Sequence, residues 1–159
     1  YLYLYNNKLS GTIPTAIGYL TSLNYLGLEH NSLSGSISTA IGYITSLNDL
    51  YLDNNILSGT IPTTIGYLTS LYYLYLYNNK LSGTIPTAIG YMTSLRNLYL
   101  NNNMLSGTVP SQLCLLTFLS YISIYEGNSL ACSSVCTLGV TSDCIPGLVH
   151  NKLSYIIYT

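Results

Sequence analysis

The chain repeats itself every 24 residues along most of its 159-residue length. Asparagine, leucine, glycine and isoleucine positions keep this interval in register over about a hundred residues. The clearest series are Asn7, Asn31, Asn55, Asn79 and Asn103; Leu9, Leu33, Leu57, Leu81 and Leu105; Gly11, Gly35, Gly59, Gly83 and Gly107; and Ile13, Ile37, Ile61, Ile85 and Val109. One such unit cannot bury its apolar residues alone, so copies must stack against each other. The repeat therefore predicts a solenoid.

The copy at residues 71–91 predicts how each coil begins. Leu74 and Leu76 alternate with tyrosines, and a period of two indicates a short strand with leucines inward and tyrosines outward. Asn79 follows where the chain must turn, and a buried amide there can pair with backbone groups of the turn and of a neighbouring coil. The asparagine series is therefore predicted to form a structural ladder: Asn7, Asn31, Asn55, Asn79 and Asn103.

The second half of the same copy predicts a turn back to the core. Gly83 lets the chain bend where a side chain would clash, and Pro86 suits the edge of a coil because it has no N–H to donate. Ile89, Met92 and Leu95 then recur at a spacing of three, which favours a 3₁₀-like segment facing the core.

A sixth, degenerate copy follows the five regular ones. Ile122 and Ile124 occupy the paired leucine positions, and Asn128 and Leu130 follow with one residue inserted near Glu126. Degeneracy is expected of a terminal repeat, whose outer face does not meet another regular coil.

The pattern Leu71-x-x-Leu74-x-Leu76-x-x-Asn79-x-Leu81-Ser82-Gly83-x-Ile85-Pro86 resembles the plant-type leucine-rich repeat. That repeat occurs in ectodomains of plant receptor-like kinases, in polygalacturonase-inhibiting proteins and in surface proteins of algae, oomycetes and other protists. The resemblance implies an α/β-type repeat: a curved solenoid with a concave parallel sheet and short 3₁₀ or irregular convex turns. It also implies that the Ser-Gly-x-Ile-Pro segments line a lateral face. Ser38 and Cys114 depart from the pattern, because they replace a proline and a glycine.

Cys114, Cys132, Cys136 and Cys144 predict a C-terminal disulfide cap. Four cysteines allow three pairings, and a zinc site is the alternative, disfavoured by irregular spacing and a single nearby histidine, His150. The predicted organisation is leucine-rich repeats over 1–131, the first of them truncated, a cap over 132–144, and a tail over 145–159 that packs on the cap or on another chain. Disulfides favour an extracellular or cell-surface location.

The balance of charges gives no support for a nucleic-acid partner. The chain has four Lys and Arg residues against five Asp and Glu residues, so electrostatics give no reason to expect nucleic acid.

No apolar run approaches the roughly 18 residues that a membrane span needs. No acid, base and nucleophile converge in a predicted cleft, so we expect neither an enzyme nor a cofactor or metal.

The outward strand positions carry the candidate binding residues. Tyrosine offers a large rigid contact area with a polar tip, which favours a binding surface, although it is also a good strand former. These tyrosines are Tyr1, Tyr3, Tyr5, Tyr25, Tyr51, Tyr73, Tyr75, Tyr77, Tyr99, Tyr121 and Tyr125. Glu29 and Asp53 share one slot on adjacent coils, with Asp49 and His30 nearby, and we expect them to lie close together. They predict either a site for a cation or basic group or a solvated polar patch.

Three functions fit these features. The first is a non-catalytic module that binds a protein, peptide or glycan through the tyrosine-rich concave face. The second is an extracellular protein that assembles head to tail into filaments with copies of itself. The third is ice binding through threonine rows such as Thr12, Ser36, Thr60, Thr84 and Thr108.

Overall fold

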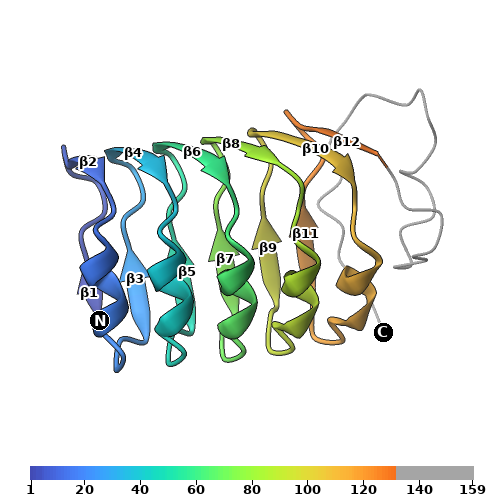
Figure 1. Cartoon of the computed structure of the whole chain (residues 1–159), viewed down its shortest axis with the longest axis horizontal. Coiled ribbons are helices and arrows are strands. Elements are labelled where there is room, and N and C mark those ends of the chain that lie inside the picture. The colour runs from blue at the N-terminus through green and yellow to red at the C-terminus, as the bar shows by residue number, and fades with distance from the viewer. Residues whose placement is uncertain (132–159) are drawn as a thin grey trace.

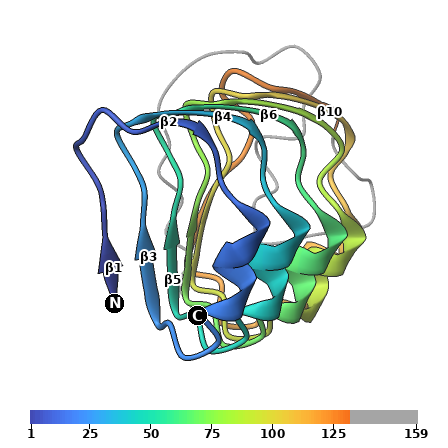
Figure 2. The same cartoon turned by 60° about the vertical axis from the view of Figure 1, so that its left-hand side comes forward.

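The computed structural model describes residues 1–131 as a stack of coils with three walls (Figures 1 and 2). The first wall is a parallel six-stranded sheet. Its strands are β1 (Leu2–Tyr3), β3 (Tyr25–Gly27), β5 (Asp49–Tyr51), β7 (Tyr73–Tyr75), β9 (Asn97–Tyr99) and β11 (Tyr121–Ser123). The predicted cap and tail, including Cys132, Cys136 and Cys144, lie outside the described residues.

Short 3₁₀ helices lie across the coil from this sheet, and a second sheet joins the two walls (Figure 2). The helices are η1 (Thr15–Tyr19), η2 (Thr39–Tyr43), η3 (Thr63–Tyr67), η4 (Thr87–Tyr91) and η5 (Ser111–Leu115). The second sheet is formed by β2 (Ser10–Thr12), β4 (Ser32–Ser36), β6 (Ile56–Thr60), β8 (Lys80–Gly83), β10 (Met104–Thr108) and β12 (Ser129–Ala131). The predicted solenoid with parallel strands and 3₁₀ turns is confirmed.

The second sheet is the main difference from the sequence-based expectation, which treated the Ser-Gly segments only as the lining of a lateral face. Serine and glycine have low strand propensity, so the segments carry no strand signal of their own. Stacking nevertheless brings their backbones side by side, where they pair as parallel strands.

The two sheets differ in register. In the first sheet Tyr51 pairs with Tyr75, so equivalent residues of adjacent coils are neighbours. In the second sheet Ser58 pairs with Lys80, which lies 22 positions further on rather than 24. Equivalent residues are therefore staggered by two positions along the strands of the second sheet.

Leucine and isoleucine side chains from all walls fill one continuous core. Leu74 and Leu76 of the first wall are fully buried, as are Ile89, Met92 and Leu95 from η4 and the turn that follows it. The alternation along the strands and the spacing of three after Pro86 therefore pointed to the correct inward residues.

The asparagines link each coil to the one before it. Asn55 accepts a hydrogen bond from the Leu33 N–H at 2.9 Å and donates to the carbonyls of Leu28 at 3.0 Å and Leu52 at 3.1 Å. The amide thus satisfies backbone groups that the turn would otherwise leave buried and unpaired. In the last copy Asn128 does the same, accepting from the Leu105 N–H at 2.8 Å.

Candidate functional site

Five tyrosines form a continuous ladder across the outward side of the first sheet. Ring centroids lie 4.6 Å apart for Tyr3 and Tyr25, 5.3 Å for Tyr25 and Tyr51, 4.8 Å for Tyr51 and Tyr75, and 4.7 Å for Tyr75 and Tyr99. Two of the four pairs, Tyr51–Tyr75 and Tyr75–Tyr99, meet edge to face, a favoured geometry for aromatic rings. We call these five residues the tyrosine ladder, and the outward side of the first sheet the tyrosine face.

Tyr25 belongs to the ladder although it is not in register with the other four tyrosines. Gly27, two residues further along, pairs with Tyr51 and so takes the corresponding position in the second coil. A Cβ on Gly27 would lie 2.8 Å from Tyr25 Cε1 and 3.1 Å from Glu29 Oε2. The missing side chain therefore leaves the space that the Tyr25 ring and the Glu29 carboxyl occupy.

The remaining predicted tyrosines flank the ladder. Tyr1 stacks on Tyr3 with centroids 6.1 Å apart, and Tyr77 lies 6.3 Å from both Tyr75 and Tyr99. Tyr73 lies 6.4 Å from Tyr75, and Tyr5 lies 6.3 Å from Tyr3. Tyr121 and Tyr125 are exposed and belong to the sixth coil.

A shallow hollow opens on the tyrosine face, lined by Tyr75, Tyr77, Tyr99, Asn101 and Ser123. Sequence reasoning named the three tyrosines but missed Asn101 and Ser123. The repeat could have identified both, because Asn101 lies 24 residues after Tyr77 and Ser123 lies 24 residues after Tyr99.

Asn97 also contributes to the order of this face. Its side-chain amide donates to the Tyr75 hydroxyl at 3.1 Å. The hydroxyl is thereby oriented, so the Tyr75 ring of the ladder is held by polar as well as aromatic contacts.

Three acids interrupt the tyrosine face on the second and third coils. Asp53 is only 2% exposed, and Asn54 donates to its Oδ2 at 2.7 Å. Burial raises the pKa of Asp53 above its usual range, although hydrogen bonds from Tyr77 and Asn54 act in the opposite direction. Burial also raises the pKa of Glu29, and the nearby Asp53 raises it further, while the Glu29 backbone and His30 act the other way.

Asp49 differs from the other two acids. Burial alone raises its pKa, with no hydrogen bond or basic neighbour acting in the opposite direction. Burial raises the pKa of Tyr25 to about 12, and the charges of Glu29 and Asp49 contribute.

A second amide row borders the acids and was not predicted. The Asn78 side chain donates to Asn54 Oδ1 at 2.8 Å, and Asn54 Nδ2 lies 3.3 Å from His30 Nε2. His30, Asn54 and Asn78 all have positive φ, a conformation that asparagine tolerates better than most residues. His30 therefore occupies the same turn position as Asn54 and Asn78 in the following coils.

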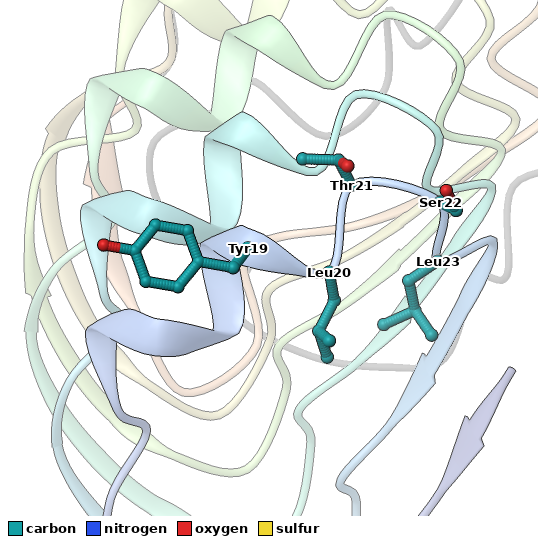
Figure 3. Close-up of a pocket in the computed structure, with 5 residues that line it drawn as sticks. All are labelled: Tyr19, Leu20, Thr21, Ser22 and Leu23. Atoms are coloured by element: carbon teal, nitrogen blue, oxygen red, sulfur yellow. The ribbon is translucent and has the colours of Figure 1, made fainter.

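A second depression lies at η1 and is lined only by residues 19–23 (Figure 3). Leu20 and Leu23 point the same way there, while Tyr19 projects away from the coil. The equivalent Ile44 and Leu47 are fully buried against the preceding coil. The leucines of this depression thus occupy core positions of the repeat, and we assign no ligand to it.

Two family models, both described as leucine-rich repeat, match the chain at residues 45–105 and at 1–20 and 22–44. Among solved structures, the receptor kinase SOBIR1 ectodomain from Arabidopsis thaliana is 33% identical, with a TM-score of 0.76, over 82% of this chain and 71% of that one. A chain of the BIR3–SERK2 complex from the same plant is 39% identical, with a TM-score of 0.72, over 82% and 68%. The chain belongs to the leucine-rich-repeat family.

Longer leucine-rich-repeat receptors match equally well. The Arabidopsis receptor kinase HAESA, solved with the peptide hormone IDA and the co-receptor SERK1, is 37% identical, with a TM-score of 0.79 over 82% of this chain. The chain spans only about a fifth of such receptors, for example 22% of HAESA. Comparison with curated proteins gives no match.

The leucine-rich-repeat segment has the non-enzymatic fold of these receptor ectodomains. Within residues 1–131, no three His, Cys, Asp or Glu side chains gather closely enough to hold a metal ion. Over the same range, no helix is long and apolar enough to cross a membrane.

The 3₁₀ wall of the leucine-rich repeats carries a separate row of tyrosines that sequence reasoning did not single out. Tyr19, Tyr43, Tyr67 and Tyr91 close the helices η1 to η4, and their exposed fractions range from 55% for Tyr67 to 86% for Tyr19. These rings face away from the core on the wall opposite the tyrosine face, so they provide a natural comparison for it.

Proposed function

We propose that the chain is an extracellular or cell-surface recognition module that binds a peptide, or a peptide-like segment of a protein, through its tyrosine face. The observation that carries this proposal is the tyrosine ladder beside the hollow lined by Tyr75, Tyr77 and Tyr99. An extended peptide laid across the strands would meet one ladder ring per coil.

The ladder is suited to binding because its rings are already ordered. Tyrosine provides a large amphipathic surface with few rotatable bonds. Rings that contact each other in the free protein lose little further conformational freedom when a ligand arrives, which improves affinity. The Tyr75 hydroxyl is also fixed, by Asn97.

Structural relatives support a peptide rather than a glycan. HAESA is seen with the peptide hormone IDA, and the plant peptide hormone receptor RGFR1 is seen with RGF2. These relatives are receptor ectodomains, which also supports a location outside the cell or on its surface.

The test is a selection from a displayed library of random short peptides on the whole chain. We expect the selected peptides to lose at least 10-fold in affinity for the Tyr75→Ala/Tyr99→Ala variant. The matched control is Tyr43→Ala/Tyr67→Ala, which removes two tyrosines from the 3₁₀ wall and should change affinity less than 2-fold. Equal losses in both variants, or binding only on a glycan array, would contradict the proposal.

The two other hypotheses lack specific support in residues 1–131. The threonine row is staggered by the register of the second sheet, and Thr60 packs its methyl group toward Gly83 of the next coil. This arrangement explains the row by packing between coils, without an ice surface. No contact within the described residues favours head-to-tail assembly over recognition.

A disulfide cap after the last coil also belongs to the proposal. At Gly42 and Gly66 a Cβ would collide with backbone oxygens of the next coil, those of Thr64 and Ala88. A side chain in this slot therefore points along the stack toward whatever follows. Cys114 occupies the same slot of the last 3₁₀ helix, which favours a bond to one of the three later cysteines.

A further inference from the structure

One acid of the tyrosine face, Asp49, has tyrosines as its neighbours on both adjacent strands. Asp49 pairs in register with Tyr25 on one side and with Tyr73 on the other. Tyr51 follows on the same strand, two residues further along and facing the same way. Asp49 therefore lies next to three tyrosines on this face, and its charge adds to burial in raising the pKa of Tyr25 and of Tyr51.

The Asp49 carboxylate has no hydrogen-bond or ion-pair partner within the described residues. Asp49 makes no hydrogen bond that lowers its pKa, and burial alone raises it. Two residues beyond Gly27, the Glu29 Oε2 atom is buried and also lacks a hydrogen-bond partner. A desolvated, unpaired carboxylate is unfavourable, and an opposite charge bound at Asp49 would relieve that cost.

No Lys or Arg side chain of residues 1–131 supplies that charge at Asp49. Lys80 begins β8 in the second sheet, and Lys8 lies just before β2 of the same sheet. Arg96 stacks on Tyr72, with its guanidinium carbon 4.9 Å from the ring centroid. The outward side of the first sheet thus carries Glu29, Asp49 and Asp53 with no compensating Lys or Arg.

A metal ion does not fit this part of the face. Asp53 is buried and already accepts a hydrogen bond from Asn54. The described acids and histidines do not form a group that could hold a metal. An organic cation suits the site better, because tyrosine faces attract arginine and lysine while a carboxylate neutralises them.

We propose that the partner of the tyrosine face is a basic peptide, and that one of its arginine or lysine side chains binds at Asp49 between Tyr25, Tyr51 and Tyr73. This inference rests on the proposed recognition function and names the chemistry of its ligand. The rest of the peptide continues along the ladder toward the hollow at Tyr75 and Tyr99. Arginine fits best, because its planar guanidinium can stack on a ring and pair with a carboxylate at once.

The same peptide library provides the test. Peptides selected on the unmodified chain should be enriched in arginine and lysine, and their affinity should fall as salt concentration rises. For these peptides, Asp49→Asn should weaken binding about 10-fold or more. The matched control is Glu126→Gln, which removes the same charge from the sixth coil and should change affinity less than 2-fold.

Exchanging the charges between peptide and protein gives a stricter test of the contact with Asp49. Replacing the essential basic residue of a selected peptide by glutamate should abolish its binding, and Asp49→Lys should restore part of it. Peptides that need Tyr75 and Tyr99 but show no basic enrichment and tolerate Asp49→Asn would overturn the inference and leave the recognition function standing. A library that yields no peptide dependent on Tyr75 and Tyr99 would overturn both.

Discussion

At the residue scale, Gly27 shows how one absent side chain shapes a surface. Glycine in a strand is ordinarily unfavourable, because it gains nothing from packing and loses much backbone freedom. Here the space above Gly27 holds the Tyr25 ring and the Glu29 carboxyl. The glycine thereby keeps the ladder continuous between Tyr3 and Tyr51.

Gly27→Ala should therefore destabilise the chain by about 1 kcal/mol, although strand propensity alone predicts a gain. The new methyl group displaces Tyr25, which loses its contacts with Tyr3 and Tyr51. Urea unfolding measures the effect. In a Tyr25→Ala background the same substitution should be neutral or stabilising, and an unchanged cost there would rule out the displaced ring as the cause.

A single buried acid, Asp53, also makes the free energy of unfolding depend on pH. Burial raises its pKa in the folded chain, so the folded state binds the proton more tightly than the unfolded state. Its contribution is therefore most favourable at acid pH and is lost as pH rises through the folded pKa. Asp53→Asn should raise the melting temperature at pH 7, and the gain should vanish near pH 3. A variant less stable than the parent at pH 7 would show that hydrogen bonds to the carboxylate outweigh its burial.

At the scale of elements, the second sheet depends on glycines with positive φ. Gly59 and Gly83 have nearly equal φ values of 74° and 76°. A Cβ on Gly59 would meet only Ser36 Cβ, at 3.5 Å, whereas one on Gly83 would meet Thr60 Cγ2 at 2.9 Å. An alanine at Gly59 would therefore test backbone strain alone, whereas an alanine at Gly83 would add a close contact with the preceding coil.

Gly59→Ala should cost about 1–2 kcal/mol, the usual penalty for a left-handed alanine. Gly83→Ala should cost measurably more, because the Thr60 methyl must also move. Thr60→Ser in the Gly83→Ala chain should bring the loss back to that of Gly59→Ala, as measured by thermal unfolding. Equal losses for the two alanines would mean that the threonine methyl yields freely.

At the scale of the whole molecule, stability comes from contacts between neighbouring coils. Asn79 accepts from the Leu57 N–H at 2.9 Å and donates to the Leu52 carbonyl at 3.0 Å, both in the coil before its own. The Asn7 amide donates only within its own coil, to the carbonyls of Leu4 and Tyr5. Equivalent residues therefore contribute unequally to the stack.

Asn79→Ala should cost about 2–4 kcal/mol, because it leaves buried backbone groups of two coils unpaired. The matched change Asn7→Ala should cost less than about 1 kcal/mol. Hydrogen exchange provides a local readout, since the Leu57 amide should lose protection in the first variant and keep it in the second. Loss of protection at Leu57 in both variants would show that the coils unfold together rather than at the broken contact.

The 24-residue period was sufficient to predict the solenoid, the inward leucines and the 3₁₀ wall. These features follow from spacing within one coil, and each coil copies them. Single residues in the repeat also indicated the tyrosine face, because alternation along a strand decides which side chains point outward.

Only the tertiary structure decided what depends on the fit between coils. The two-residue stagger of the second sheet, the contacts of the Tyr25 ring with Tyr3 and Tyr51, and the burial of Asp53 have no signal within a single repeat. Each arises where one coil meets its neighbours. The candidate site belongs to this second class, because the ladder and the tyrosines next to Asp49 are assembled from residues of successive coils.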